Sequence, residues 1–239
     1  RVQQAAYSLI PEDQKKALHL QIGRLMLANL PQEEREERIF DIVNHLNTGI
    51  ELLTAQGERD SLAQLNLTAG KQAKASTAYQ PALAYFKVGM GLLAEEGWQR
   101  QYELTLALHT EGAEAAYLSG DFEGMEELAA VVLERARALL DQVKVYEVKI
   151  QAYILQDKKR EALQTGLEVL SLLGVRFPET PNKLHILLGL LKTKLVLAGK
   201  RIEDLIDLPE MADPYKVAAA RILISISAPA YQTLPELFP

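Results

Sequence analysis

The chain has 239 residues, of which 48% are hydrophobic and 24% charged, a composition that supports a sizeable buried core. The formal net charge of −6 disfavours binding of the whole molecule to nucleic-acid phosphates or to anionic lipid. There is no cysteine, which excludes disulfides and thiolate metal sites and fits a reducing cytoplasm.

Apolar residues recur with a helical period along the whole chain. Residues 1–9 are predicted to end a helix that begins upstream, and the chain opens without the pattern of a signal peptide, so we expect a cytoplasmic fragment of a larger protein. Pro11 and Pro31 suit the first turn of a helix and predict two further helices, which end near residues 30 and 49. We assign residues 1–49 to a helical boundary segment.

From residue 50 onward the pattern predicts paired helices. Their expected ranges are 60–76, 79–94, 99–119, 121–140, 143–156 and 158–173. The joints between them have only two or three residues, and connections this short make neighbouring helices antiparallel.

The pairs also repeat in the manner of tetratricopeptide hairpins. That repeat needs a small residue in each helix where the two cross, and a bulky residue four positions after the second one. Gly70, Ala82 and Phe86 satisfy the pattern. Two more degenerate copies keep the twelve-residue interval, namely Ala113 with Met125 and Ile150 with Ala162. We therefore predict an all-α fold in which residues 50–174 form antiparallel hairpins stacked as a tetratricopeptide-like, right-handed solenoid.

Residues 175–239 are predicted to hold further helical repeats. The segment 184–198 is strongly apolar but carries Lys192 and Lys194, and it is too short to span a bilayer. We expect it to be core for another hairpin; the alternative is a helix lying on a membrane surface. A last helix from Tyr215 to about Ser227 ends in apolar residues, so we expect the array to continue past residue 239.

Motifs for chemistry are absent or misplaced. Residues 89–94 fit the spacing of a dinucleotide fingerprint, but that fingerprint needs a strand before it, and here it lies within a predicted helix. The four histidines, His19, His45, His109 and His185, have no second ligand at i+3 or i+4, as helix-borne metal sites usually do. We expect no catalytic residue, cofactor or metal in this chain.

A binding surface is the functional feature that the predicted fold suggests. In stacked hairpins the first helix of each pair lines the concave face. The repeat register places eight residues there: Lys71, Lys74, Thr110, Glu114, Tyr117, Lys144, Glu147 and Gln151. Two interpretations stay open, an ordinary exposed helix face or a groove of mixed charge for a peptide or another ligand.

Several segments resemble one family of multidomain kinases. They are residues 1–12, 18–25, 40–47, 120–126, 189–195 and 202–211. These stretches resemble large bacterial multi-sensor kinases of the cyanobacterial type. In that family a serine/threonine kinase domain precedes an AAA/STAND-type ATPase module, and a tetratricopeptide-like helical region leads to a GAF sensor and a histidine kinase.

The resemblance implies that residues 1–9 end the winged-helix part of the ATPase module and that the rest is the helical region after it. It implies a non-catalytic scaffold or sensor in two-component signalling, whose partner is a protein, a peptide or a neighbouring domain, and no nucleic acid. The parent would be an ATP-dependent serine/threonine and histidine kinase. The alternative is a small-molecule receptor that uses the solenoid concavity or an apolar pocket.

Overall fold

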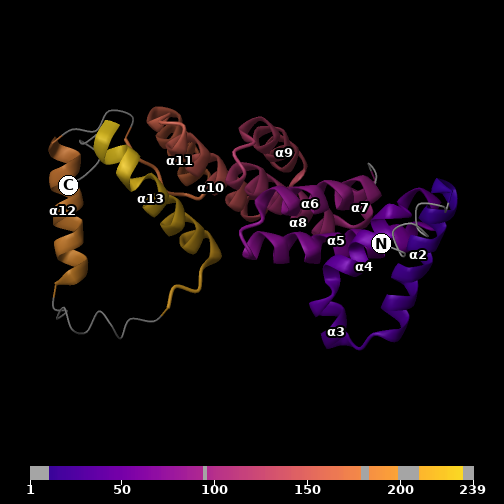
Figure 1. Cartoon of the computed structure of the whole chain (residues 1–239). Coiled ribbons are helices and arrows are strands. Elements are labelled where there is room, and N and C mark those ends of the chain that lie inside the picture. The colour runs from indigo at the N-terminus through magenta and orange to yellow at the C-terminus, as the bar shows by residue number, and fades with distance from the viewer. Residues whose placement is uncertain (1–10, 94–95, 179–182, 199–209, 234–239) are drawn as a thin grey trace. The chain divides into compact units, whose positions relative to one another are not determined.

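The computed structural model describes residues 11–93, 96–178, 183–198 and 210–233, and every regular element in these ranges is helical (Figure 1). The predicted all-α class is confirmed for this part of the chain. The helix predicted over residues 1–9 lies outside the described residues. The chain divides into two compact units, residues 1–128 and 129–239, which we describe separately. The division at residues 49 and 174 stays a prediction.

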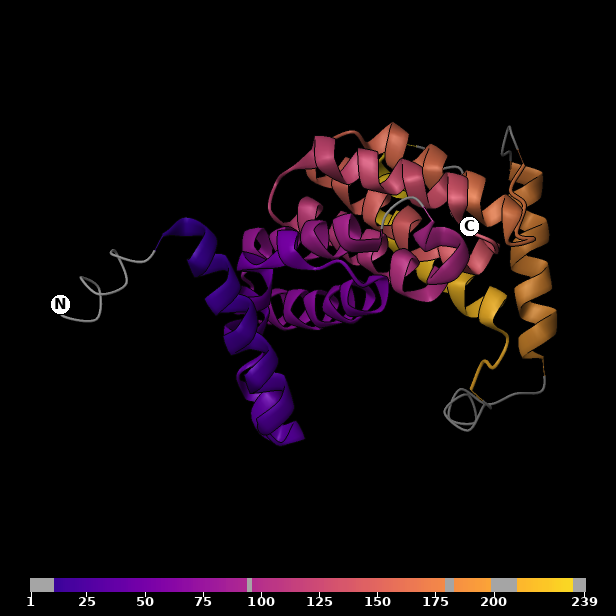
Figure 2. The same ribbon diagram turned by 90° about the vertical axis from the view of Figure 1, so that its right-hand side faces the viewer.

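The first unit is built from short connections between successive helices. Its elements are α2 (Glu12–Asn29), α3 (Gln32–Glu37), α4 (Ile39–Thr48), the 3-10 helix η1 (Ile50–Leu52), α5 (Gln56–Ala75), α6 (Tyr79–Leu93), α7 (Gly97–Arg100) and α8 (Tyr102–Leu118). Helix α9 (Phe122–Arg135) begins in this unit. Figure 1 and Figure 2 show α5, α6 and α8 from two sides.

Helix α2 packs antiparallel on α4, and α4 packs on α5. The approach of α2 is close, because a Cβ added at Gly23 would lie 2.6 Å from Leu46 Cδ2. The α4–α5 contact holds a reciprocal amide pair: Asn47 Nδ2 donates to Asn66 Oδ1 over 2.9 Å, and Asn66 Nδ2 donates back to Asn47 Oδ1 over 3.0 Å. Asn66 is fully buried. The two hydrogen bonds of the pair therefore offset the free-energy cost of removing these amide groups from water.

Helices α5 and α6 form an antiparallel hairpin around a small residue. A Cβ at Gly70 would lie 2.3 Å from Cε1 of Phe86, and both Ala82 and Phe86 are fully buried. The contact between the glycine and the phenylalanine, expected from the repeat pattern, is therefore present. Since the ring lies directly over the α5 backbone, the two helices approach more closely there than larger side chains would permit.

Helix α8 packs against α6 and beside α5. It runs antiparallel to α6, because Gly89 faces Leu108 while Gly112 faces Met90 and Phe86. Gly89 and Gly91, which fit the dinucleotide fingerprint by spacing, lie within α6. The first serves helix packing and the second faces open space.

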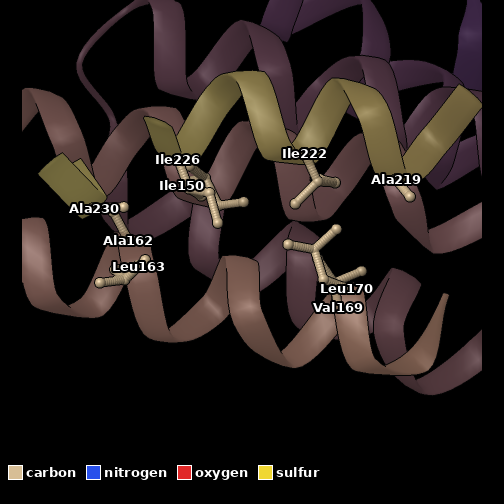
Figure 3. Packing of buried hydrophobic residues seen from close by; sticks show 9 residues of the cluster. All are labelled: Ile150, Ala162, Leu163, Val169, Leu170, Ala219, Ile222, Ile226 and Ala230. Atoms are coloured by element: carbon tan, nitrogen blue, oxygen red, sulfur yellow. The ribbon is translucent and has the colours of Figure 1, made fainter. Parts of the chain in front are cut away.

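The second unit holds α10 (Leu139–Leu155), α11 (Lys159–Leu172), α12 (Lys183–Leu197) and α13 (Pro214–Thr233). Helix α13 packs on both α10 and α11. Their shared core consists of nine buried residues: Ile150, Ala162, Leu163, Val169, Leu170, Ala219, Ile222, Ile226 and Ala230 (Figure 3). In Figure 3, Ala230 lies near Ala162, and Ile222 lies near Leu170, so α13 runs antiparallel to α11. The relation of α13 to α10 and α11 thus repeats that of α8 to α5 and α6.

Several helix boundaries differ from the prediction. Helix α5 begins at Gln56 rather than near residue 60, and the helix predicted between Pro31 and Gly49 is divided at Arg38 into α3 and α4. The range 99–119 is interrupted at Gln101, which separates α7 from α8. The joint expected at Asp141 and Gln142 lies instead at residues 136–138. The reason is that the Asp141 carboxylate accepts a hydrogen bond from the Ala138 backbone N–H over 3.2 Å, so Asp141 belongs to the first turn of α10, where an acidic residue is favourable.

Helices α12 and α13 carry exposed apolar side chains. Leu187, Leu191 and Leu195 of α12 are more than half exposed, and Ile224 of α13 is 74% exposed. Helix α13 reaches Thr233 and contains Pro229, so it is longer than predicted. Among the described helices none has both the length and the apolarity needed to cross a membrane.

The hairpin contact at Gly70 is testable by adding one methyl group. We expect Gly70→Ala to lower the free energy of unfolding by about 1–3 kcal/mol, because the new Cβ overlaps the fully buried Phe86 ring. Gly91→Ala is the matched control: nothing lies within 4 Å of its added Cβ, so it should be neutral or stabilise by up to about 1 kcal/mol. Urea denaturation of both variants measures the difference, and equal stabilities would contradict the packing.

A second methyl insertion tests the docking of α13. A Cβ at Gly166 of α11 would lie 2.3 Å from Ile226 Cγ2, so Gly166→Ala should destabilise the second unit by about 1–3 kcal/mol and increase hydrogen exchange in α13. Gly189→Ala in α12, where the added Cβ meets no atom within 4 Å, is the control. If exchange in α13 is unchanged by Gly166→Ala, α13 is not held by this contact.

Candidate functional site: the face of the first helices

Five of the eight predicted binding residues lie on α5 and α8, the first helices of two successive hairpins. Lys71 and Lys74 come from α5, and Thr110, Glu114 and Tyr117 come from α8. The two helices pack side by side, and the Lys74 ammonium donates hydrogen bonds to the carboxylates of both Glu111 and Glu114. The structure therefore joins these predicted positions through an ion cluster between helices.

The cluster is partly shielded from solvent. The Lys74 and Glu114 side chains are each 20% exposed, so their charges interact more strongly than those of fully exposed pairs. Burial alone would lower the pKa of Lys74, but the hydrogen bonds that its ammonium donates to Glu111 and Glu114 outweigh it and raise that pKa above 10.5. This stabilisation is present below pH 10.5 and is lost as the pH rises through the higher folded value.

Two neighbours of the cluster are more available to a partner. The Lys71 side chain is 52% exposed, and its Nζ lies 3.8 Å from Glu111 Oε1. Tyr117 is partly buried, and burial together with the charge of Glu114 raises the pKa of its phenol above 10.0, so the hydroxyl stays protonated and can donate a hydrogen bond at neutral pH. Thr110 Oγ1 is buried and has no hydrogen-bond partner among the described residues.

The other three predicted residues lie on α10 in the second unit. Gln151 is exposed and Lys144 is partly exposed. Glu147 is only 12% exposed, and its Oε2 accepts a hydrogen bond from Arg221 Nη2 of α13 over 2.5 Å. Its Oε1 is buried without a hydrogen-bond partner in the described part of the chain. Glu147 is thus occupied by an ion pair with α13, an arrangement that resembles the α5–α8 cluster of the first unit.

Sequence reasoning missed Glu111 and Arg221. A signal for Glu111 was present, because Lys71 and Lys74 have the same three-residue interval as Glu111 and Glu114 on a helix one repeat later. Complementary charges at equal spacing on parallel neighbouring helices can pair in register. Arg221 gave no such signal, since only the docking of α13 on α10 brings it to Glu147.

The histidines, which appear scattered in the sequence, have distinct environments. His19 of α2 and His45 of α4 meet with their Nδ1 atoms 2.9 Å apart. His109 of α8 lies beside Trp98, with ring centroids 5.1 Å apart, and its Nδ1 contacts the Thr105 carbonyl over 2.8 Å. Burial lowers the pKa of His109. No group of three or more His, Cys, Asp or Glu residues able to hold a metal ion occurs among the described residues.

From the ion cluster we expect that replacing Lys74 lowers the free energy of unfolding more than replacing Lys71 does. Lys74→Met should lower the free energy of unfolding by about 1–2 kcal/mol, because it leaves Glu111 and Glu114 side by side without their shared cation. Lys71→Met should cost less than about 0.5 kcal/mol, since its ammonium is half exposed. Urea denaturation at low and high salt measures both values. Salt should reduce the cost of Lys74→Met by screening the two carboxylates, and equal costs for the two lysines would contradict the cluster.

Comparison with known proteins gives one similarity. No protein-family profile and no solved structure matches the chain. It is similar to hybrid signal transduction histidine kinase G of Dictyostelium discoideum, with 29% identity over 199 residues. The match covers 73% of this chain but 6% of that protein, so the chain spans a small part of its relative's length. The similarity supports the signal-transduction kinase context that the sequence motifs predicted.

Proposed function

We propose that this chain is a non-catalytic helical-repeat scaffold or sensor region of a multidomain signal-transduction kinase. Its tetratricopeptide-like hairpins would present the first-helix face to a protein or peptide partner, or to a neighbouring domain of the same chain. Binding there would regulate the kinase or ATPase output of the parent protein.

The observation that carries this proposal is the recurrence of one packing arrangement. Helix α8 packs on the hairpin of α5 and α6, and α13 packs on the hairpin of α10 and α11. In each case the added helix forms an ion pair with the first helix of the hairpin, Lys74 with Glu111 and Glu147 with Arg221. Repetition of this kind is typical of solenoids, whose concave faces commonly serve as binding surfaces.

The kinase context is supported by the similarity to a hybrid histidine kinase. The finer assignment, to the helical region that follows an AAA/STAND-type ATPase module in a cyanobacterial-type serine/threonine and histidine kinase, rests on the sequence resemblance. We propose a role in signalling for this region without a cofactor or catalytic group of its own, because the sequence carries no motif for catalysis or cofactor binding in a suitable structural context.

The ion pairs of Lys74 and Glu147 limit the kinds of partner that can bind to the first helices. A ligand that depended on Lys74 or Glu147 as a free charge would have to break an existing ion pair. The accessible groups are the Lys71 ammonium and the Tyr117 phenol in the first unit and, separately, the Gln151 amide in the second. This set favours a partner that forms scattered hydrogen bonds along a helix face, such as a protein surface or a peptide, over a compact, highly charged small molecule.

Site-specific photo-crosslinking tests the proposal. A photoreactive amino acid replaces Lys71 on α5 in the full-length parent protein; the control replaces Ala84, which is exposed on the second helix α6. We expect crosslinks to a protein or to another domain from position 71 and few or none from position 84. Equal crosslinking from both positions, or none from either, would overturn the assignment of this face.

The alternative is that the chain is a small-molecule receptor. A separate experiment tests this prediction. A thermal-shift screen of metabolites against the 239-residue chain would favour it if a compound raises the melting temperature and Lys71→Glu abolishes the shift. That outcome, together with the absence of position-specific crosslinks, would favour the receptor over the scaffold.

A further inference from the structure

The His19–His45 contact joins two like titratable groups across a helix interface. The two Nδ1 atoms are 2.9 Å apart, and the ring centroids are 4.7 Å apart. A hydrogen bond between two ring nitrogens needs one Nδ1 that carries a proton and one that accepts it. The bond can exist only while at least one imidazole is neutral, because a second proton removes the acceptor and places two cations in contact.

The pair lies within the closest part of the α2–α4 packing. Gly23 on α2 faces Leu46, next to His45, and Gly49 at the end of α4 faces Leu20, next to His19. Charge repulsion between the two rings would therefore act on adjoining backbones that have little room to adjust. Two ion pairs at the surface also hold helix α2, Lys16 with Glu51 over 2.5 Å and Arg24 with Glu58 over 2.6 Å.

Acidic and basic groups both lie on the elements packed around the pair. On α4, Asp41 favours the charged form of His45, while Arg38, which pairs with Asp41 over 3.3 Å, opposes it. On α2 the neighbouring cations are Lys15 and Lys16. Among the described side chains, the remaining charges of the packed elements are Arg24 on α2, Glu51 on η1, Glu33, Glu34, Arg35, Glu36 and Glu37 on α3, and Glu58, Arg59, Asp60, Lys71 and Lys74 on α5. Of these, Glu51 and Glu58 are paired with Lys16 and Arg24.

We propose that His19 and His45 form a proton-operated latch, which holds α2 on α4 at neutral pH and releases α2 when acidification places a second proton on the pair. This inference does not depend on the function proposed above. It assigns to the N-terminal helix of the described chain a conformational response to pH that the hairpins α5, α6 and α8 would not share.

The pKa of His45 gives the direction of the response. Burial first, and then the neighbouring His19, lower this pKa below the ordinary value of 6.5. A histidine whose folded pKa is depressed contributes stability that is fully present above the unfolded value and is lost as the pH falls from 6.5 towards the folded value. The latch is therefore closed above pH 6.5 and opens during acidification below it.

Hydrogen exchange of the 239-residue chain at pH 7.5 and pH 5.5, corrected for intrinsic exchange rates, measures the latch. A chelator in the buffer prevents a metal ion from bridging the imidazoles. We expect amides of α2 to exchange severalfold faster at pH 5.5, while those of α5 and α6 keep their protection. His45→Gln keeps a hydrogen-bonding group without a titrating ring and should abolish the acceleration.

His109→Gln is the matched control, because the pKa of His109 is also lowered by burial but its ring lies on α8; this variant should retain the acceleration in α2. The proposal is overturned if α2 exchange does not change with pH, or if His45→Gln responds as the original chain does.

If His45→Gln leaves α2 open at both pH values, an NMR titration of the His19 and His45 ring signals in the original chain decides. Coupled titration supports the latch, and independent titration overturns it.

Discussion

The structure depends on bulky side chains that lie directly over glycine at helix crossings. Phe86 covers Gly70 in the first unit, Ile226 covers Gly166 in the second, and in both cases an added methyl carbon would lie 2.3 Å from the covering side chain. Because each covering side chain fits directly against the backbone of the facing helix, a shift of one helix along the other would create an overlap or a void. Interiors packed at this density resist a change of even one methyl group.

The close crossings determine which charges can meet. Once α8 is seated on the α5–α6 hairpin, Lys74 reaches both Glu111 and Glu114, and once α13 is seated on α11, Arg221 reaches Glu147. Ion pairs of partly buried groups contribute less through net attraction than through the cost of breaking them. They therefore disfavour other registers of the helices. In the first unit they leave Lys71 and Tyr117, and in the second Gln151, as groups that a partner can engage.

The N-terminal part of the first unit is held differently. Helix α4 is joined to α5 by the buried amide pair of Asn47 and Asn66, neither of which changes its charge with pH. Helix α2 is joined to α4 by a histidine pair, which does. One side of α4 is thus bound by a pH-independent contact and the other by a pH-dependent one, so acidification can move α2 without disturbing the hairpins.

The helical class, many helix boundaries and the small–bulky contact of Gly70 with Phe86 follow from the sequence alone, because each depends on local period, on proline and glycine signals, or on a fixed interval along the chain. The sequence predicts the joint before α10 too late, because an acidic residue such as Asp141 fits a loop as well as the first turn of a helix. The pairing of Glu147 with Arg221 and of His19 with His45 follows only from tertiary packing, because these contacts join residues 26 or more positions apart on helices whose docking no local spacing predicts. For Lys74 the equal spacing of Glu111 and Glu114 is a signal, but only the seating of α8 beside α5 brings the charges together.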